Sequence, residues 1–232
     1  MMKRNESMTV VFPDGKKETK ETVVITEHVL DVMINEKPYY RLVCTKSDLK
    51  ELVTGRLCTD GLIEKAGDIN RIIICKNDSE ADLSVDKDIL EEDAKMALKK
   101  LPGYEWKSEW VFSLANEFKK GSKLHDLTGG SHVCILAKNG KPAYICEDIG
   151  RHNAVDKAVG YALINGIPLS ECMLFISGRV PTDMVEKVIR ARIPVLVSKS
   201  VPTAESVELA KEYDLTLICR AWPDRFEIFG EA

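Results

Sequence analysis

The sequence predicts an α/β protein, α+β overall, in which a mixed sheet with flanking helices follows a smaller β-rich unit. From Thr128 onward, short apolar runs alternate with amphipathic helical segments, which implies crossovers between parallel strands in a covered sheet. Before residue 77, apolar and polar residues alternate between turn signals, as they do in antiparallel strands. We therefore expect a β-rich domain with one helix at residues 1–76, a helical connector at 77–127 and an α/β domain at 128–232.

The β-rich domain is expected to begin with two strands that turn at Pro13-Asp14-Gly15. Residues 21–45 alternate well enough for two strands that turn near residues 35–38. Residues 47–61 are expected to be helical, with Ser47 as the N-cap. The apolar face of this helix consists of Leu49, Leu52, Val53 and Leu57.

Helical patterns continue in the connector, at residues 89–101 and 108–121. Asn139-Gly140 then gives the strongest hairpin signal, because a type I′ turn requires positive φ at both central positions. Further elements are predicted as a helix from Asn153, a strand at 172–177, a helix at 181–192, a strand at 194–198, a helix at 203–213 and a strand at 215–219.

Composition excludes several classes of partner. The 33 basic and 37 acidic side chains give a net charge of −4, so no overall positive field attracts nucleic acid, and an anionic ligand must be held by a local cluster. No apolar run approaches the roughly 18 residues of a membrane helix, so we expect no membrane partner and a cytoplasmic location. The seven cysteines mostly lie in apolar runs and fit buried, reduced thiols.

A dense polar turn lies between the strand ending near Cys146 and the next helix. Glu147, Asp148, Arg151 and His152 fall where α/β proteins place ligands, because helix N–H groups point into the crevice there. A structural ion-pair network is the alternative interpretation. Further along, Asn153 and Asp156 resemble a capping pair, while Asp156 and Lys157 could equally form a solvated face.

Two later turns carry the same kind of signal. Ser177-Gly178-Arg179 ends a buried strand with a hydroxyl and a guanidinium, and Pro181 opens the next helix. After the last parallel strand, Arg220 and Arg225 flank Trp222-Pro223, which suits phosphate binding beside a stacked base or pterin. A C-terminal hairpin with a packed tryptophan is the alternative. Three arginine-bearing turns together indicate an anionic ligand.

Zinc and nucleophile chemistry can be tested on the same residues. The zinc deaminase signature needs H-x-E and P-C-x-x-C at two helix starts. Here Ala154 stands where the glutamate after His152 would be, and the second turn offers no thiol, so no zinc is expected. The hairpin register predicts that Cys134 and Cys146 point to opposite faces and are poor disulfide partners. A hydrolase that uses Ser177 or Cys146 with His152 stays a minor alternative.

Several motifs together resemble the formate dehydrogenase accessory protein family, FdhD, over nearly the whole chain. The motifs are TGGSH (128–132), EDIGRHNAVDKAVG (147–160), SGR (177–179) with Lys187, IPVLVSKSVPTAESVELA (193–210), LTLICRAWPDRFEIF (215–229) and, more loosely, LVCTKSDLKELVTGRLCTDGLIEKAGDI (42–69). The resemblance implies a cytidine-deaminase-like C-terminal domain without zinc, a smaller N-terminal domain and a homodimer.

The resemblance also implies a function. Members bind molybdenum bis-molybdopterin guanine dinucleotide, of which GDP is a fragment, and act as sulfurtransferases that pass sulfur to it from a cysteine desulfurase before it enters the formate dehydrogenase apoenzyme. By position, the cofactor-binding residues are Arg220, Ala221, Trp222, Pro223, Asp224 and Arg225, together with Thr128, Gly129, Gly130, His132, Asp148, Arg151, His152, Ser177, Gly178 and Arg179.

One departure from the family separates two hypotheses. The family's sulfur-carrying cysteine belongs to a C-G-x-C-G-like segment before the TGG turn, and this chain has no cysteine between Cys75 and Cys134. A persulfide carrier needs an accessible thiol of low pKa, which cysteines in apolar runs do not supply. The chain is therefore either a sulfur carrier that uses another cysteine or a cofactor-binding chaperone without sulfurtransferase activity.

Overall fold

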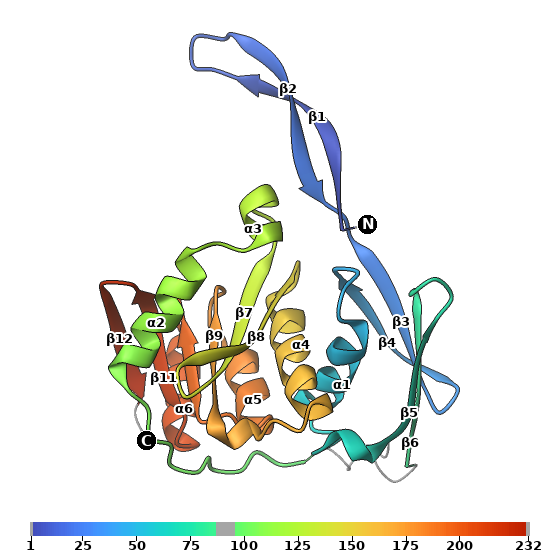
Figure 1. The fold of residues 1–232 in the computed structure, drawn as a ribbon, viewed down its shortest axis with the longest axis vertical. Helices are drawn as coiled ribbons and strands as arrows, with labels where there is room; N and C mark the ends of the chain where they lie inside the picture. The colour runs from blue at the N-terminus through green and yellow to red at the C-terminus, as the bar shows by residue number, and fades with distance from the viewer. Residues whose placement is uncertain (1, 87–95, 231–232) are drawn as a thin grey trace.

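The computed structural model describes residues 2–86 and 96–230, and its largest element is a six-stranded mixed sheet (Figure 1). In spatial order its strands are β12 (Arg225–Gly230), β11 (Thr216–Trp222), β10 (Val195–Ser198), β9 (Cys172–Ile176), β7 (His132–Lys138) and β8 (Lys141–Asp148). Strands β9, β10 and β11 are parallel, whereas β7 and β12 run the other way. This confirms the predicted mixed α/β fold and brings the carboxyl ends of β8, β9, β10 and β11 to one edge.

Helices cover both faces of this sheet, and its central strands β7, β9 and β10 are buried almost throughout. The helices after the hairpin are α4 (Arg151–Ile164), α5 (Thr182–Arg190) and α6 (Ala204–Glu212). They share one apolar core with alternate strand residues such as Leu174 and Leu196. Helix α2 (Ser108–Lys119) packs on the opposite face against Phe175 and Val197. The short helix α3 (Lys123–Thr128) leads from α2 into β7.

The N-terminal region contains a second sheet and a projecting hairpin. The sheet has the order β4 (Lys37–Cys44), β3 (His28–Ile34), β6 (Glu80–Val85) and β5 (Ile69–Cys75). The hairpin, β1 (Lys3–Val11) with β2 (Lys17–Ile25), extends away from the body of the molecule (Figure 1). It turns at residues 12–16, which agrees with the predicted turn, but β2 takes up residues 21–25, which we had assigned to the next strand pair.

Helix α1 (Leu49–Thr59) joins the N-terminal region to the main sheet by lying against α4. Their backbones approach so closely that a Cβ on Gly55 would lie 1.7 Å from the Asp156 carbonyl oxygen, and one on Gly160 would lie 1.8 Å from that of Glu51. The predicted apolar face of α1 is buried in the same core as α4. The two regions therefore share one hydrophobic core.

Several local expectations differ from the structure. Strand β6 occupies the start of the segment expected to be a helical connector. The predicted helix at 89–101 falls partly on residues 87–95, which lie outside the described residues, and 96–101 have no regular secondary structure. Asp48, in the left-handed region at φ 51°, precedes α1 in place of a Ser47 cap. Helix α4 starts two residues earlier than predicted, after Gly150.

The β7–β8 hairpin has the predicted turn but a different register. Asn139 and Gly140 both have positive φ, as a type I′ turn requires. The pairing then shifts by one residue, with Ala137 opposite Pro142 and Leu136 opposite Tyr144, so Cys134 lies directly opposite Cys146. The prediction that these thiols point to opposite faces is therefore wrong, because a bulge between Pro142 and Tyr144 leaves Ala143 as an extra residue that strand counting ignores.

Candidate functional site

The polar turns singled out in the sequence meet at one edge of the six-stranded sheet. Asp148, Ser177 and Trp222 stand at or just after the carboxyl ends of β8, β9 and β11, and the Gly129-Gly130 turn leads into β7 at the same edge (Figure 1). Open α/β sheets bind ligands at this edge, because loops and helix N-termini converge there. The candidate site is therefore built from segments far apart in the sequence.

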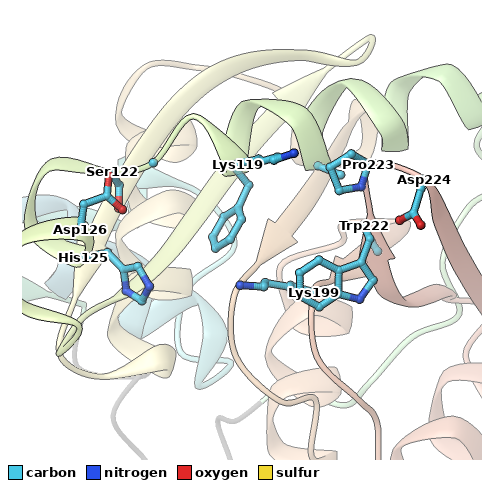
Figure 2. A pocket seen from close by; sticks show the side chains of 12 residues that line it. Lys119, Ser122, His125, Asp126, Lys199, Trp222, Pro223 and Asp224 are labelled. Carbon is cyan, nitrogen blue, oxygen red and sulfur yellow. The ribbon is translucent and has the colours of Figure 1, made fainter.

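Two adjoining cavities form a crevice at this edge, and Figure 2 shows the larger one. The larger cavity has a volume of about 510 Å³ and the smaller one of about 390 Å³. Both are lined by Phe118, His125, Lys199 and Trp222. The larger cavity is completed by Ala115, Lys119, Gly121, Ser122, Asp126, Ala221, Pro223 and Asp224. The smaller cavity is completed by Gly129, Gly130, Ser131, His132, Ser177 and Ser200.

Trp222 and Lys199 are two of the residues that line both cavities. Trp222 stands at the β11–β12 turn with 39% of its surface exposed. The Lys199 ammonium, just after β10, lies 4.9 Å from the centre of the Trp222 ring and 5.1 Å from that of Phe118. In Figure 2, Trp222 and Lys199 lie across the larger cavity from His125 and Asp126. The crevice thus presents a cation held between two aromatic faces.

Helix α3, which carries His125 and Asp126 into the crevice, is held in place by Glu147. The Glu147 carboxylate accepts hydrogen bonds from Ser122 Oγ at 2.6 Å and from the backbone N–H groups of Leu124 and His125 at 3.1 and 2.7 Å. A carboxylate at a helix N-terminus satisfies N–H groups that lack an intrahelical partner. Glu147 therefore fixes the position of α3, which lines the crevice.

The Thr128-Gly129-Gly130 turn ends α3 and borders the smaller cavity. Gly129 caps the helix at φ 63°, a conformation that favours glycine. The Thr128 hydroxyl donates to the Leu124 carbonyl and accepts from Gly130 N–H. A Cβ on Gly130 would lie 3.1 Å from Ile25 at the base of the β1–β2 hairpin. The turn is thus tight and partly exposed.

His132 and Ser177 form a pair at the floor of the smaller cavity. His132 Nδ1 lies 3.2 Å from Ser177 Oγ, which also accepts a hydrogen bond from Val133 N–H. Burial, followed by the charge of Arg151, lowers the pKa of His132 below its ordinary value of 6.5. Gly178 packs between His132 and Arg151, since a Cβ there would lie 3.1 Å from Arg151 Cβ.

Arg151 contributes an unsatisfied donor beside this pair. Its Nε is buried and has no hydrogen-bond partner among the described residues. A buried donor without a partner is costly, and such atoms are usually satisfied by a ligand or water. The Arg151 side chain lies near His132, but it is not among the residues that line the two cavities.

Arg179, Arg220 and Arg225, the other three arginines predicted to bind the cofactor, have different surroundings. Arg220 forms two 3.0 Å contacts with the Glu227 carboxylate of β12, and Arg225 contacts Asp224 at 3.5 Å. Arg179 is exposed and makes no ion pair or side-chain hydrogen bond within the described part of the chain. Arg179 is therefore the freest of the three guanidinium groups.

Asp148 belongs to a buried structural network and does not reach the crevice. It pairs with Lys157 at 2.7 Å, with both side chains fully buried, and it accepts from Gly150 N–H and Asn153 Nδ2. The expected Asn153–Asp156 cap is therefore wrong, because Asn153 is used to hold Asp148. At Asp148, the turn is therefore the structural ion-pair network of the alternative interpretation and not part of a ligand site.

Asp156 and His152 also serve the packing of the helices. Asp156 is fully buried, where it accepts from Thr59 Oγ1 at 2.6 Å and pairs with Lys187 at 2.8 Å, so the solvated-face interpretation is wrong. His152 Nε2 lies 3.3 Å from Asp183 of α5, and burial lowers the pKa of His152. Neither residue lines the two cavities.

No cysteine resembles an activated thiol. All seven are free, and all but Cys75 are buried. Burial raises the pKa of Cys44, Cys58 and Cys219 to about 12 and that of Cys172 to about 11. Partial desolvation raises the pKa of Cys75, and burial places that of Cys146 well above its usual value. The shifts keep these thiols protonated near neutral pH.

The structure does not bring together the residues that the minor hydrolase alternative requires. Ser177 contacts His132, whereas His152 contacts Asp183, so the pairing of Ser177 with His152 that this alternative requires does not occur. Cys146 is buried and donates toward the Ala154 carbonyl. Among residues 2–86 and 96–230, no cluster of histidine, cysteine or carboxylate side chains could hold a metal ion.

Sequence reasoning missed several residues that line the crevice, among them Phe118, Lys119, His125 and Lys199. The rule that ligands lie beyond the carboxyl ends of parallel strands points to Lys199, which follows β10 directly. No such rule points to Phe118 on α2. Helical periodicity predicts which face of the helix is buried, but it does not predict which edge of the sheet the end of the helix reaches.

Comparisons with known proteins agree with the expected family. The model of the FdhD/NarQ family matches residues 25–102 and 88–232. A sulfur carrier protein FdhD of Bacillus licheniformis is 29% identical, with 94% of this chain and 92% of that protein aligned. A protein FdhD of Methanocaldococcus jannaschii is 33% identical over 90% of this chain and 88% of that protein.

A solved structure has the same fold. The crystal structure of a putative formate dehydrogenase accessory protein from Desulfotalea psychrophila superposes with a TM-score of 0.87 and is 26% identical. The superposition covers 99% of this chain and 97% of that chain. The similarity therefore extends over both the N-terminal region and the six-stranded sheet.

Proposed function

This chain belongs to the FdhD/NarQ family, and from that premise we propose that it is a formate dehydrogenase accessory protein that binds molybdenum bis-molybdopterin guanine dinucleotide in the crevice. The observation that carries the proposal is the Lys199 ammonium held between Trp222 and Phe118, where two cavities meet. Aromatic planes next to a free cation suit a ligand that has both a flat ring and phosphates.

The two cavities differ in chemistry, and the difference suits a guanine nucleotide. The larger cavity combines the Trp222 ring with the Asp224 carboxylate, which can accept from the N–H edge of guanine. The smaller cavity offers Gly130, Ser177 and His132, and the charge of Arg151 acts on His132 from outside the cavity lining. We assign the base to the larger cavity and the phosphates to the smaller one. The residues of the chain then bind and orient the cofactor as cargo.

Calorimetry with GDP, a fragment of the cofactor, tests the proposal. We expect saturable binding that Arg179→Ala and Arg225→Ala weaken, because both remove positive charge next to the lining residues, Arg179 two residues after Ser177 and Arg225 directly after Asp224. Arg220→Ala is the matched comparison, since its guanidinium is already neutralised by Glu227, and it should change the affinity much less. If the wild-type protein does not bind GDP at all, the proposal is refuted.

The base assignment has its own test. Asp224→Asn should reduce the preference for GDP over ADP, because an amide presents a donor as well as an acceptor to the guanine edge. The isosteric change keeps the shape of the cavity, so a loss for both nucleotides alike would contradict a role of Asp224 in reading the base.

Sulfur transfer is a second candidate, because relatives of this chain are named sulfur carrier proteins. As a carrier, the chain would accept persulfide sulfur from a cysteine desulfurase and pass it to the cofactor before insertion into the formate dehydrogenase apoenzyme. Cys75 is the only cysteine that is partly exposed, yet partial desolvation and the Glu80 carboxylate raise the pKa of its thiol. We therefore propose the cofactor chaperone as the primary function and the sulfurtransferase as the alternative.

Persulfide labelling separates the two candidates. The purified protein is incubated with a cysteine desulfurase and cysteine, and its peptides are then analysed by mass spectrometry. Absence of a labelled cysteine supports the chaperone, whereas a persulfide on Cys75 that Cys75→Ala removes supports the carrier.

The expected homodimer and cytoplasmic location remain part of the proposal. Within the described residues, no helix has the length and apolar character needed to cross a membrane. Light scattering of the purified protein distinguishes the 26.0 kDa monomer from a dimer of twice that mass.

A further inference from the structure

Lys199 lies where the flat ring of a ligand would stack. Its ammonium lies over the Trp222 ring and is also within 5.1 Å of the Phe118 ring centre. Lys199 makes no ion pair or side-chain hydrogen bond in the described part of the chain, although Asp126 and Asp224 line the same cavity. The aromatic faces therefore provide the main local attraction for this charge.

Lys199 lines both cavities, so its ammonium can be placed in either of them. On one side lies the aromatic half, with Trp222 and Pro223. On the other side lie the Gly129-Gly130 turn and the Ser177 hydroxyl, to which we assigned phosphates. A lysine side chain has four rotatable bonds, so its ammonium can move from the ring to a phosphate without a change in the backbone.

We propose that Lys199 makes the crevice selective for phosphorylated ligands by competing with the ligand ring for Trp222. An uncharged nucleoside must displace the ammonium from the ring without offering it another partner. A nucleoside diphosphate displaces it and also accepts it, because phosphate forms a strong charge-assisted hydrogen bond with an ammonium. This inference rests on the proposed function and adds a specificity residue to it.

The test compares GDP with guanosine by calorimetry, using the full-length protein and Lys199→Met. Methionine keeps an unbranched apolar chain but cannot form a cation–π contact. We expect the variant to bind GDP about tenfold more weakly, because a hydrogen bond to a charged group is lost. We also expect it to bind guanosine about two- to fivefold more tightly, which is the size of a cation–π contact at an exposed site.

Lys141→Met is the matched control, because it removes the same charge from an exposed lysine at the start of β8, at the opposite edge of the sheet. It should leave the affinities for both ligands close to those of the wild type. A second measurement needs no ligand: the indole N–H resonance of Trp222, assigned with Trp222→Phe, should shift in Lys199→Met and not in Lys141→Met.

The outcomes distinguish this inference from the proposed function. Wild-type protein that does not bind GDP refutes both. GDP binding together with an unchanged or weaker guanosine affinity in Lys199→Met refutes only the competition, and it leaves Lys199 as a simple positive charge. An indole resonance that does not respond to Lys199→Met contradicts the contact between the ammonium and the ring.

Discussion

Lys157 Nζ lies 2.7 Å from Asp148 Oδ2, and neither side chain has any exposed surface. The pair joins the two regions of the chain. Lys157 also donates to Thr45 Oγ1 at 2.6 Å, and Asp148 accepts from Thr45 N–H at 3.0 Å, just after β4. On its other side, Asp148 accepts from Gly150 N–H, which fixes the turn that leads to Arg151. The pair therefore links the N-terminal sheet to the edge that carries the crevice.

Lys157→Met should destabilise the protein strongly. The change leaves the Asp148 carboxylate buried without its counter-charge, and breaking a buried ion pair costs about 3–5 kcal/mol. Urea denaturation should show this loss in the free energy of unfolding, whereas Lys141→Met, on an exposed lysine, should change it little. A loss no larger than that of Lys141→Met would show that Asp148 is readily solvated.

Gly55→Ala should disrupt the contact between α1 and α4. A Cβ at this position would lie 1.7 Å from the Asp156 carbonyl oxygen and 2.7 Å from Gly160 N, so the two backbones must separate. Overpacking of this kind costs about 1–3 kcal/mol or more. Gly67→Ala is the control, since nothing lies within 4 Å of its Cβ. Thermal unfolding should separate the two variants, and equal melting temperatures would contradict the close crossing.

Strand-end reasoning places much of the site correctly. Ser177 and Trp222 stand out because each follows a predicted strand, and they do meet at one edge of the sheet. The Gly129-Gly130 turn, which lies at the same edge, was indicated only by the family resemblance. Strand-end reasoning works because apolar runs define buried strands, and parallel crossovers put the strand ends together. This part of the site can therefore be predicted without knowing which side chains contact one another.

The rest depends on partners distant in the sequence. Lys157 looks solvated by its charge, but in the structure it is buried, where it contacts Asp148 and also Thr45, 112 residues earlier. The Cys134–Cys146 pairing depends on a bulge at Ala143, which shifts the register without a change in the apolar pattern. Lys199 and Phe118 come together through the packing of α2, which periodicity alone does not specify.

Glu147→Ala should loosen α3 while leaving the rest of the fold intact. The variant removes the carboxylate that accepts from Leu124 and His125 N–H, and losing a helix N-terminal cap costs about 0.5–2 kcal/mol. Hydrogen exchange should therefore become faster at residues 122–128, and GDP should bind more weakly because His125 lines both cavities. Glu117→Ala, which removes an ion pair with Lys120 at the end of α2, should leave exchange in α3 unchanged.

The affinity for GDP should depend on pH through His132. Burial, and then the Arg151 charge, lowers the pKa of His132 below 6.5, so the imidazole is neutral at pH 7.5 in the free protein. A phosphate beside the imidazole favours the charged form and raises the pKa of His132 in the complex. The complex then binds more protons than the free protein, so GDP binding tightens as the pH falls from 7.5 to 5.5.

His132→Gln should lose this tightening. Because the GDP phosphate itself titrates near pH 6, the informative quantity is the ratio of the two affinities at each pH. We expect the ratio of wild-type to variant affinity to rise about threefold or more between pH 7.5 and 5.5, since one unit of pKa shift corresponds to a tenfold change in affinity. His28→Gln, on β3 of the other sheet, should keep the wild-type profile. A constant ratio would place the phosphates away from His132 and move them to the Arg179 side of the edge.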